Sequence, residues 1–453
     1  MAITLSQYPT SPNLANNNLV HEVSSDQIGQ PQFQYLCDIK DDADNLIQRL
    51  KQQPNPSGYG VFDIGMILTS NVGPTDEIWK IEESTINNSC GKDFKVFFGE
   101  EYATSVSGSP TIYTGAGGAG APTVTGSSYY FDLDGTLDPN DKVNWNWNSS
   151  SKYVEELIDD ITFTHQFGLT DFPATNDVRL GEFQTISLIN GNANGIAPNI
   201  ASAQDVYAMV VTEYDTTSSL LDTTTYYNDS NNGSGGPRST DTQVWGQVYT
   251  SQSLSTRLIH FPVGPQNFAE IGNTLNTNTV YYICNFYAQQ TDGNINTDGV
   301  WGSYRFNLAD PSCGYDGVRF AWKNKYGVWD YYTFPLAETT LDGIDRQTFK
   351  QTFVNFSTTN NTVAYDKSRR GKTQFINKIN KNRTAETNWI TQEYADVLVE
   401  LFFSTNVYIQ DGSEFLPIVV TNSGLVEKTN PRSQKLFKYT LEYTLANDTQ
   451  NRL

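Results

Sequence analysis

Residues 318–334 constrain the fold more than any other stretch, because they carry the pattern of a β-hairpin. Val318, Phe320 and Trp322 recur at every second position, so an extended strand puts them on one face and the residues between them on the other. Residues 324–327 (NKYG) supply a turn, since Gly327 can take the positive φ that tight reversals need. The aromatic run VWDYYTF at 328–334 then predicts the returning strand.

A single amphipathic helix is predicted further along the chain. Its apolar stripe has helical spacing and consists of Tyr394, Val397, Leu398, Leu401 and Phe402. Thr391 stands before the stripe as an N-cap, whose hydroxyl can accept a hydrogen bond from the amide of Glu393 or Tyr394. Strand patterns follow at 415–421 and 435–445. We therefore predict a compact α+β docking module over residues 311–453, with Trp322, Trp329 and the helix of 389–402 in its core.

Two earlier regions show short alternating strands separated by turn residues. In residues 1–103 the expected strands are 3–5, 19–23, 33–39, 46–51, 78–83 and 92–98, with a short helical turn within 61–68. In residues 201–310 they are 207–214, 223–227, 243–249, 257–261, 280–288 and 303–308. Residues 104–200 are a Gly-rich loop and an irregular connecting segment with one strand at 182–190.

The predicted fold class is therefore mainly β. It consists of tandem antiparallel β-sandwich domains of the immunoglobulin or fibronectin kind, plus the C-terminal α+β module with one amphipathic helix. Composition agrees, because 13% aromatic and 17% charged residues favour polar-surfaced β folds over helical bundles or disorder. No apolar run approaches the ~18 residues of a membrane span. The first residues also lack the basic and apolar parts of a signal peptide, so we expect no membrane association.

Acidic charge is concentrated in the first two thirds of the chain. The net charge is −21; residues 311–453 hold 17 Lys and Arg against 15 Asp and Glu, which leaves 12 against 35 in residues 1–310. An acidic body joined to a near-neutral end suits head-to-tail packing with copies of itself or with a basic neighbour. The alternative is that the acidic surface only keeps the protein soluble. General nucleic-acid binding is disfavoured, because it needs a net basic face.

One basic cluster interrupts this distribution. Lys367, Arg369, Arg370, Lys372, Lys378, Lys381 and Arg383 fall within 17 residues that hold no acidic group. We expect them to lie on a strand or arm that contacts an acidic protein neighbour. Two alternatives stay open, a solvated strand face without a partner and a nucleic-acid contact.

Residues 129–137 (YYFDLDGTL) match the first motif of haloacid-dehalogenase-type phosphotransferases, in which the first Asp is the nucleophile and the second the acid/base. That chemistry needs a parallel β/α framework, a downstream Lys and Mg²⁺, and the following sequence has no such pattern. A calcium loop through Asp132, Asp134, Asp138 and Asp141 lacks the bidentate Glu at its end. The GAGGAG run within 104–128 lacks the feeding strand and the Lys-Ser/Thr of a phosphate loop. We interpret both stretches as turns or loops and predict no catalytic residue.

The cysteines and histidines do not indicate a metal site. Cys37, Cys90, Cys284 and Cys313 show no CxxC spacing, and the chain has only three histidines. We therefore expect neither zinc nor any other metal or cofactor. Cys37 and Cys90 lie in one predicted domain, where a disulfide between them is one alternative; buried, reduced thiols are the preferred interpretation.

Several short segments, taken in order, carry a resemblance to a known family. They are residues 3–5 (ITL), 35–39, 54–68 (PNPSGYGVFDIGMIL), 97–102 (FFGEEY), 168–173 (GLTDFP), 261–267 (FPVGPQN), 322–334, 388–390 (NWI), 417–423 (PIVVTNS) and 436–447 (LFKYTLEYTLAN). In this order they resemble virion structural proteins of tailed bacteriophages of the Bacteroidota and marine lineages, crAss-like phages included. The resemblance covers nearly the whole chain and brings no catalytic residue with it.

The resemblance implies a tail, neck or baseplate component that is assembled in the host cytoplasm and carried in the virion. Such proteins usually form rings, so the implied partners are copies of the chain and other virion proteins of the tail or neck. A rival interpretation is a virion adhesin, in which loop aromatics such as Trp145, Trp147 and Trp245 stack on sugars. The phosphatase remains a third and remote interpretation.

Overall fold

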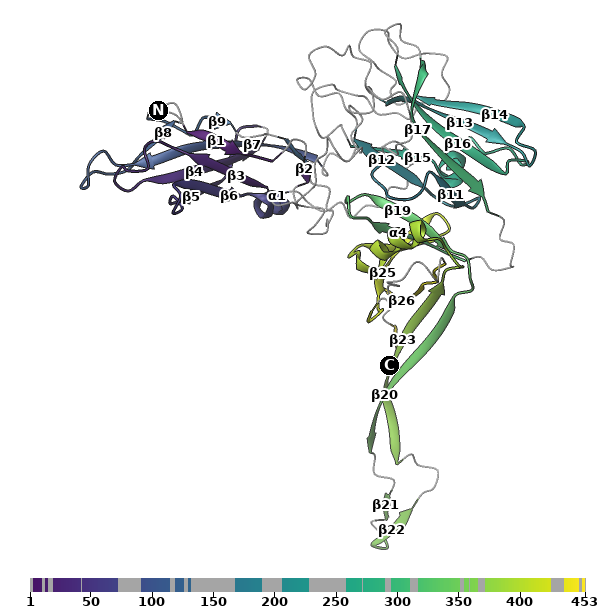
Figure 1. Ribbon diagram of the computed structural model, residues 1–453. Coiled ribbons are helices and arrows are strands. Elements are labelled where there is room, and N and C mark those ends of the chain that lie inside the picture. Colours follow the sequence, from purple (N-terminus) through teal and green to yellow (C-terminus); the bar gives the residue numbers. More distant parts are fainter. Residues whose placement is uncertain are drawn as a thin grey trace. The chain divides into compact units, whose positions relative to one another are not determined.

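A computed structural model shows that the chain is mainly β, with several antiparallel sheets and a few helices (Figure 1). The structure describes residues 3–9, 13–14, 19–41, 43–71, 91–114, 119–125, 129–131, 168–189, 206–227, 258–270, 272–289, 295–309, 317–350, 354–357, 359–365, 371–424, 436–447 and 450–452. By its internal contacts the chain divides into two compact units. The first unit is Met1–Asp310 with Trp322–Asp330, and the second is Pro311–Ala321 with Tyr331–Leu453.

A β-sandwich forms the N-terminal part of the first unit. One sheet has the order β1-β3-β6, from β1 (Thr4–Gln7), β3 (Val20–Ser24) and β6 (Tyr59–Asp63). The other has the order β2-β10-β7-β4-β5, from β2 (Asn13–Leu14), β10 (Tyr129–Phe131), β7 (Gly91–Tyr102), β4 (Gln34–Asp41) and β5 (Leu46–Gln52). Two short strands, β8 (Thr111–Thr114) and β9 (Val124–Thr125), also pair with β7. Phe62 of one sheet packs on Phe98 of the other at 5.9 Å between ring centroids, so apolar inner faces join the sheets.

The predicted helical turn near residue 65 lies later than expected. Residues 61–63 still belong to β6, and helix α1 spans Gly65–Asn71. The Asp63 carboxylate accepts hydrogen bonds from the amides of Leu19 and Gly65, each at 3.1 Å, and so ends the strand and begins the helix. The predicted strand 78–83 lies outside the described residues.

The rest of the first unit is built around a five-stranded sheet of order β11-β17-β16-β13-β14. Its strands are β11 (Thr175–Val178), β17 (Ile295–Leu308), β16 (Tyr281–Gln289), β13 (Val206–Tyr214) and β14 (Leu220–Tyr227), and β11 pairs with β17 in parallel. A two-stranded sheet of β12 (Thr185–Ile189) and β15 (Leu258–Pro262), followed by helix α3 (Pro265–Glu270), shares its core. Phe261 of β15 packs edge-on against Phe286 of β16 at 4.9 Å. The predicted strand 243–249 is outside the described part.

The second unit is built on an eight-stranded sheet with one covering helix, although the hairpin end Trp322–Asp330 of two of its strands belongs to the first unit. The strand order is β19-β18-β24-β25-β26-β23-β20, and β27 also pairs with β23. The strands are β18 (Val318–Lys323), β19 (Trp329–Phe334), β20 (Thr339–Lys350), β23 (Lys372–Glu386), β24 (Val407–Asp411), β25 (Glu414–Val420), β26 (Thr440–Leu445) and β27 (Gln450–Arg452). Helix α4 (Gln392–Phe403) packs on this sheet through Tyr394 against Tyr332 and Phe402 against Tyr439.

The predicted helix is confirmed, but two of its details are wrong. Its stripe is buried at Val397, Leu398 and Leu401, as the spacing indicates. Thr391 occupies the N-cap position, yet its side chain makes no capping hydrogen bond. Trp389 is 64% exposed, because it precedes the helix and lies outside the core of the sheet.

The predicted hairpin is β18 and β19, and Gly327 has the expected positive φ of 78°. The expected contrast between two faces is absent, because all six residues of β18 are buried, Arg319 and Lys323 included. Trp322 and Trp329 are buried, but both fall within the first unit, and Trp322 packs on Phe172 there. They are therefore not core residues of the C-terminal module.

Candidate docking hairpin

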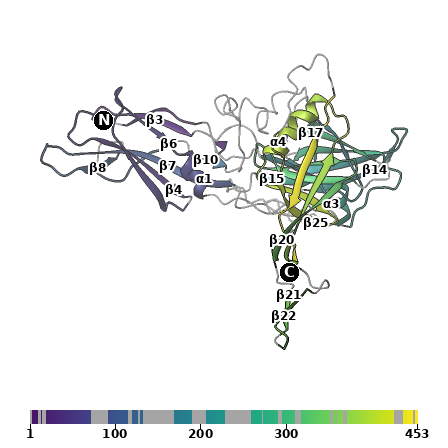
Figure 2. The same cartoon turned by 90° about the horizontal axis from the view of Figure 1, so that it is seen from below.

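The strands β20 and β23 form an unusually long two-stranded ribbon, which we call the arm (residues 339–386). Its antiparallel register runs from Thr339 opposite Thr384 to Lys350 opposite Lys372, with a β-bulge between Gln347 and Thr348. Figures 1 and 2 both show the ribbon running out from the sheet of the second unit. A smaller hairpin of β21 (Val354–Ser357) and β22 (Thr362–Tyr365) lies at the far end of the arm.

Only the near end of the arm is held by the sheet. β26 pairs with β23 from Arg383 to Glu386, and β27 pairs with it from Asn377 to Ile379. From residue 372 to residue 376, which is the end of β23 farthest from the sheet, β23 pairs with β20 alone. We call residues 346–377 the tip. The five consecutive residues 346–350 are all exposed, so in this part both faces of β20 meet solvent.

Four of the seven predicted contact residues lie on β23. Lys372 is exposed, while Lys381 and Arg383 are half-buried. The backbone register pairs Asp345 with Lys378 and Asp342 with Lys381. The remaining three, Lys367, Arg369 and Arg370, lie outside the described residues.

Arg383 has a structural role within the second unit. Its guanidinium lies 3.3 Å from Oε1 of Glu338, and the same oxygen accepts a 2.7 Å hydrogen bond from the Tyr443 hydroxyl. Burial and the neighbouring carboxylate raise the pKa of Tyr443, which keeps this hydroxyl a donor. Arg383 thereby joins β23 to the sheet and is a poor candidate for contact with another molecule.

The tip contains basic residues that the sequence cluster missed. Arg346 and Lys350 are exposed on β20, and Lys350 stands directly opposite Lys372. Residues 346–377 hold six basic residues and one acidic residue, a net charge of +5. The predicted cluster of residues 367–383 left out Arg346 and Lys350, because only the pairing of β20 with β23 brings them beside it. Apolar side chains are also exposed along the arm, at Leu341 (69%) and Val363 (51%).

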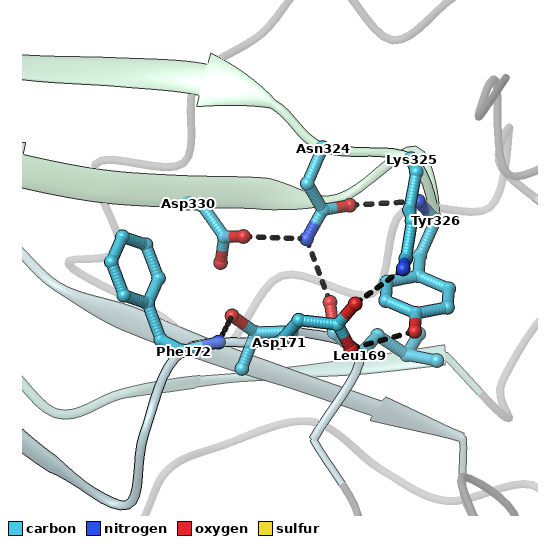
Figure 3. A network of polar contacts seen from close by, with 8 residues as sticks. Leu169, Asp171, Phe172, Asn324, Lys325, Tyr326 and Asp330 are labelled. Carbon is cyan, nitrogen blue, oxygen red and sulfur yellow. Dashed lines mark hydrogen bonds and ion pairs between the residues drawn. The ribbon is translucent and has the colours of Figure 1, made fainter. Parts of the chain in front are cut away.

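A second polar constellation lies in the first unit, at the turn of the β18–β19 hairpin (Figure 3). The Asn324 amide donates to the carbonyl of Leu169 at 2.8 Å and to the carboxylate of Asp330 at 2.9 Å. Asp171 accepts a 2.8 Å hydrogen bond from the Tyr326 hydroxyl and forms an ion pair with Lys325. These bonds satisfy buried polar groups and fix the turn on residues 168–172, so the constellation is a structural one.

The described residues contain no group of three or more His, Cys, Asp or Glu that could hold a metal ion. Asp132, Asp134, Asp138 and Asp141 lie outside the described residues, as do Trp145, Trp147 and Trp245. Cys37 and Cys284 are buried free thiols, and burial raises the pKa of both. Cys90 and Cys313 are not among the described residues. In the part of the chain that the structure describes, no helix is long and apolar enough to span a membrane.

Comparison with known proteins adds no family. No protein-family model matches the chain, and no curated protein matches it. The arm is therefore interpreted from its own geometry and charge.

Proposed function

We propose that this protein is a non-enzymatic structural component of a tailed-phage virion. In this proposal it belongs to a ring of the tail, neck or baseplate and docks to neighbouring subunits through the arm. The observation that carries the docking role is the ribbon at 346–350 and 372–374, where two strands pair with each other alone. Residues 346–350, Lys372 and Gln374 are exposed in it. An isolated two-stranded hairpin is at best marginally stable in water, so a neighbouring subunit would supply the missing burial.

Two further observations support an assembly role. The arm carries exposed apolar side chains beside basic ones, a mixture typical of protein contacts. The ordered segments named above resemble phage virion proteins, and this resemblance implies assembly in the host cytoplasm and a mature protein in the particle. Subunits that present unlike surfaces to their two neighbours close into rings.

The proposal is tested by shortening the arm. Asn-Gly in place of residues 346–377 closes β20 and β23 with a two-residue turn after Asp345 and before Lys378, which are opposite each other. We expect the variant to fold. We expect cryo-electron microscopy to find repeating copies of the full chain in purified particles. The shortened variant should be absent from such particles. The control replaces the exposed β13–β14 turn, residues 215–219, in the same way.

Two results would overturn the proposal. One is a chain that is made during infection and absent from purified particles. The other is a shortened variant that enters particles as well as the control does.

A further inference from the structure

One row of side chains crosses all five strands of the β11-β17-β16-β13-β14 sheet on the face away from its core. Neighbouring residues of a strand point to opposite faces, and the core lies on the side of Tyr282 and Phe306. Tyr281 and Asn307, which stand opposite each other, therefore face outward. Read from β11 to β14, the residues that the register places opposite one another are Asp177, Asn307, Tyr281, Tyr214 and Leu220.

Contacts along this row fix the guanidinium of Arg305. Arg305 lies two residues before Asn307 on β17, and its Nε donates to the Asn307 side-chain oxygen at 2.9 Å. The Asn307 amide nitrogen donates in turn to the Asp177 carboxylate at 3.0 Å. Cζ of Arg305 lies 3.7 Å from the centroid of the Tyr281 ring, and Tyr281 stacks on Tyr214 at 4.9 Å. Stacking and a hydrogen bond thus pre-organise a side chain that is exposed.

The two Nη atoms of this guanidinium are not used within the described part of the chain. Among the described residues, none accepts a hydrogen bond from Nη1 or Nη2 of Arg305, and the carboxylate of the row is engaged by Asn307. Arg49 shows the alternative, because its Nε and Nη2 bind the two carboxylate oxygens of Asp38 at 2.5 and 2.7 Å. The fork of Arg49 is filled from within the fold, whereas that of Arg305 is open.

The charge around the row limits what can fill this fork. Residues 1–310 hold 35 acidic and 12 basic residues, so a segment with several carboxylates is repelled. A single carboxylate in an otherwise uncharged segment gains the bidentate pair without that repulsion. At the far end of the row, Leu220 is 61% exposed and offers apolar contact. From β17 to β14 is about 14 Å at a strand spacing of ~4.8 Å, which an extended peptide covers in about four residues.

We propose that this row binds a protein segment that carries one carboxylate and, about four residues away, one apolar side chain. The partner's carboxylate pairs with Nη1 and Nη2 of Arg305, and its apolar side chain packs on Leu220 and Tyr214. Arginine and tyrosine are the residue types that often dominate the energy of protein interfaces. The row shares no residue with the arm, so this contact does not depend on the docking role proposed for the arm.

The experiment uses the full chain and an array of immobilised seven-residue peptides. Each peptide has Glu at its second position, Leu at its sixth and uncharged residues elsewhere, and each has a counterpart with Gln in place of Glu. Arg305→Gln removes the cation, and Arg305→Lys keeps the charge without the fork. Arg346→Gln, which removes an exposed arginine of β20, is the matched control. Hydrogen exchange of β16 and β17 checks that each variant is folded.

We expect the wild-type chain to bind the preferred Glu peptides roughly tenfold or more tightly than their Gln counterparts, because the charge-assisted pair is lost with Gln. Arg305→Gln should abolish this preference, Arg305→Lys should lose most of it, and Arg346→Gln should keep it. A wild-type chain without the preference overturns the proposal, as does equal loss in Arg305→Gln and Arg346→Gln. Binding of uncharged oligosaccharides that Arg305→Gln abolishes, without any preference for Glu, assigns the row to sugars and also overturns it.

The apolar end of the row is tested with Leu220→Ser. This variant should weaken the binding of Glu and Gln peptides by the same factor, roughly threefold or more, because it removes apolar contact and leaves Arg305 in place. Unchanged binding of both peptide sets would overturn the four-residue spacing.

Discussion

The central strands of the five-stranded sheet in the first unit and the arm of the second are long and antiparallel, yet they are stabilised differently. Along β16, Tyr282, Cys284 and Phe286 are buried and alternate with half-exposed residues, so one face packs into a core. Along β20, residues 346–350 are exposed without alternation. The sheet gains its stability from burial inside the chain, whereas the arm keeps its apolar and charged side chains available at the surface.

The largest effect is expected in the core of the five-stranded sheet. Phe286 is fully buried and packs against Phe261 and Tyr304. Phe286→Ala should lower the free energy of unfolding of this sheet by about 3–5 kcal/mol, because it removes an aromatic ring and leaves a cavity. Hydrogen-exchange mass spectrometry measures this sheet separately from the others. A loss below about 1 kcal/mol would contradict the packing described for it.

A slightly smaller effect is expected under helix α4. Leu398 is fully buried on the apolar stripe of the helix. Leu398→Ala should cost about 2–5 kcal/mol in the second unit, depending on how far the site collapses. Urea denaturation followed by hydrogen exchange of β18, β24 and β26 reports this loss. A change within about 0.5 kcal/mol would show that the helix does not pack on the sheet.

Acid should weaken the N-terminal sandwich through His21. This side chain is buried against Phe98, and burial lowers its pKa from 6.5 to about 4. Between those values the unfolded chain binds the proton and the folded chain does not, so stability falls as the pH falls from about 6.5 to about 4. The full loss is about 3 kcal/mol. His21→Phe should flatten the pH dependence of sandwich unfolding in this window, and an unchanged dependence would assign it to other groups.

The smallest effect is expected on the arm. Leu341 is 69% exposed on β20, so Leu341→Ala should change the stability of the isolated chain by no more than about 0.5 kcal/mol. Thermal unfolding compared with wild type measures this. If the same substitution weakens incorporation into particles, the side chain serves a contact between molecules; a large loss of stability in the isolated chain would place it in an internal core.

Much of the fold follows from residue patterns. The hairpin, helix α4 and most of the described sandwich strands have clear alternation or helical spacing and were placed close to their observed bounds. Strand β17 begins eight residues before its expected start, and β6 occupies part of the expected helical turn. The strands expected at 78–83 and 243–249 lie outside the described residues. The arm was not recognised as a ribbon, because TTLDGIDRQTFK in β20 has neither regular alternation nor an apolar core face. Strand propensity is weak where burial does not select the residues.

The candidate site was only partly predictable for a related reason. Basic residues close in sequence were found, whereas Arg346 and Lys350 reach the same tip through the pairing of β20 with β23. The internal use of Arg383 depends on Glu338 and Tyr443, which are distant in sequence. Local patterns carry no information about such partners. The predicted domain boundaries and the roles of the seven basic residues stay predictions.

The turn at Asn324 also has a consequence for how the protein is made. Asn324 and Tyr326 bond to Leu169 and Asp171, each across 155 positions of the chain. A growing polypeptide leaves the ribosome from its N-terminus, so residues 168–172 wait for their partners until more than half of the remaining chain has been synthesised. The N-terminal sandwich can mature early, while the last polar groups of the first unit are satisfied only late in translation.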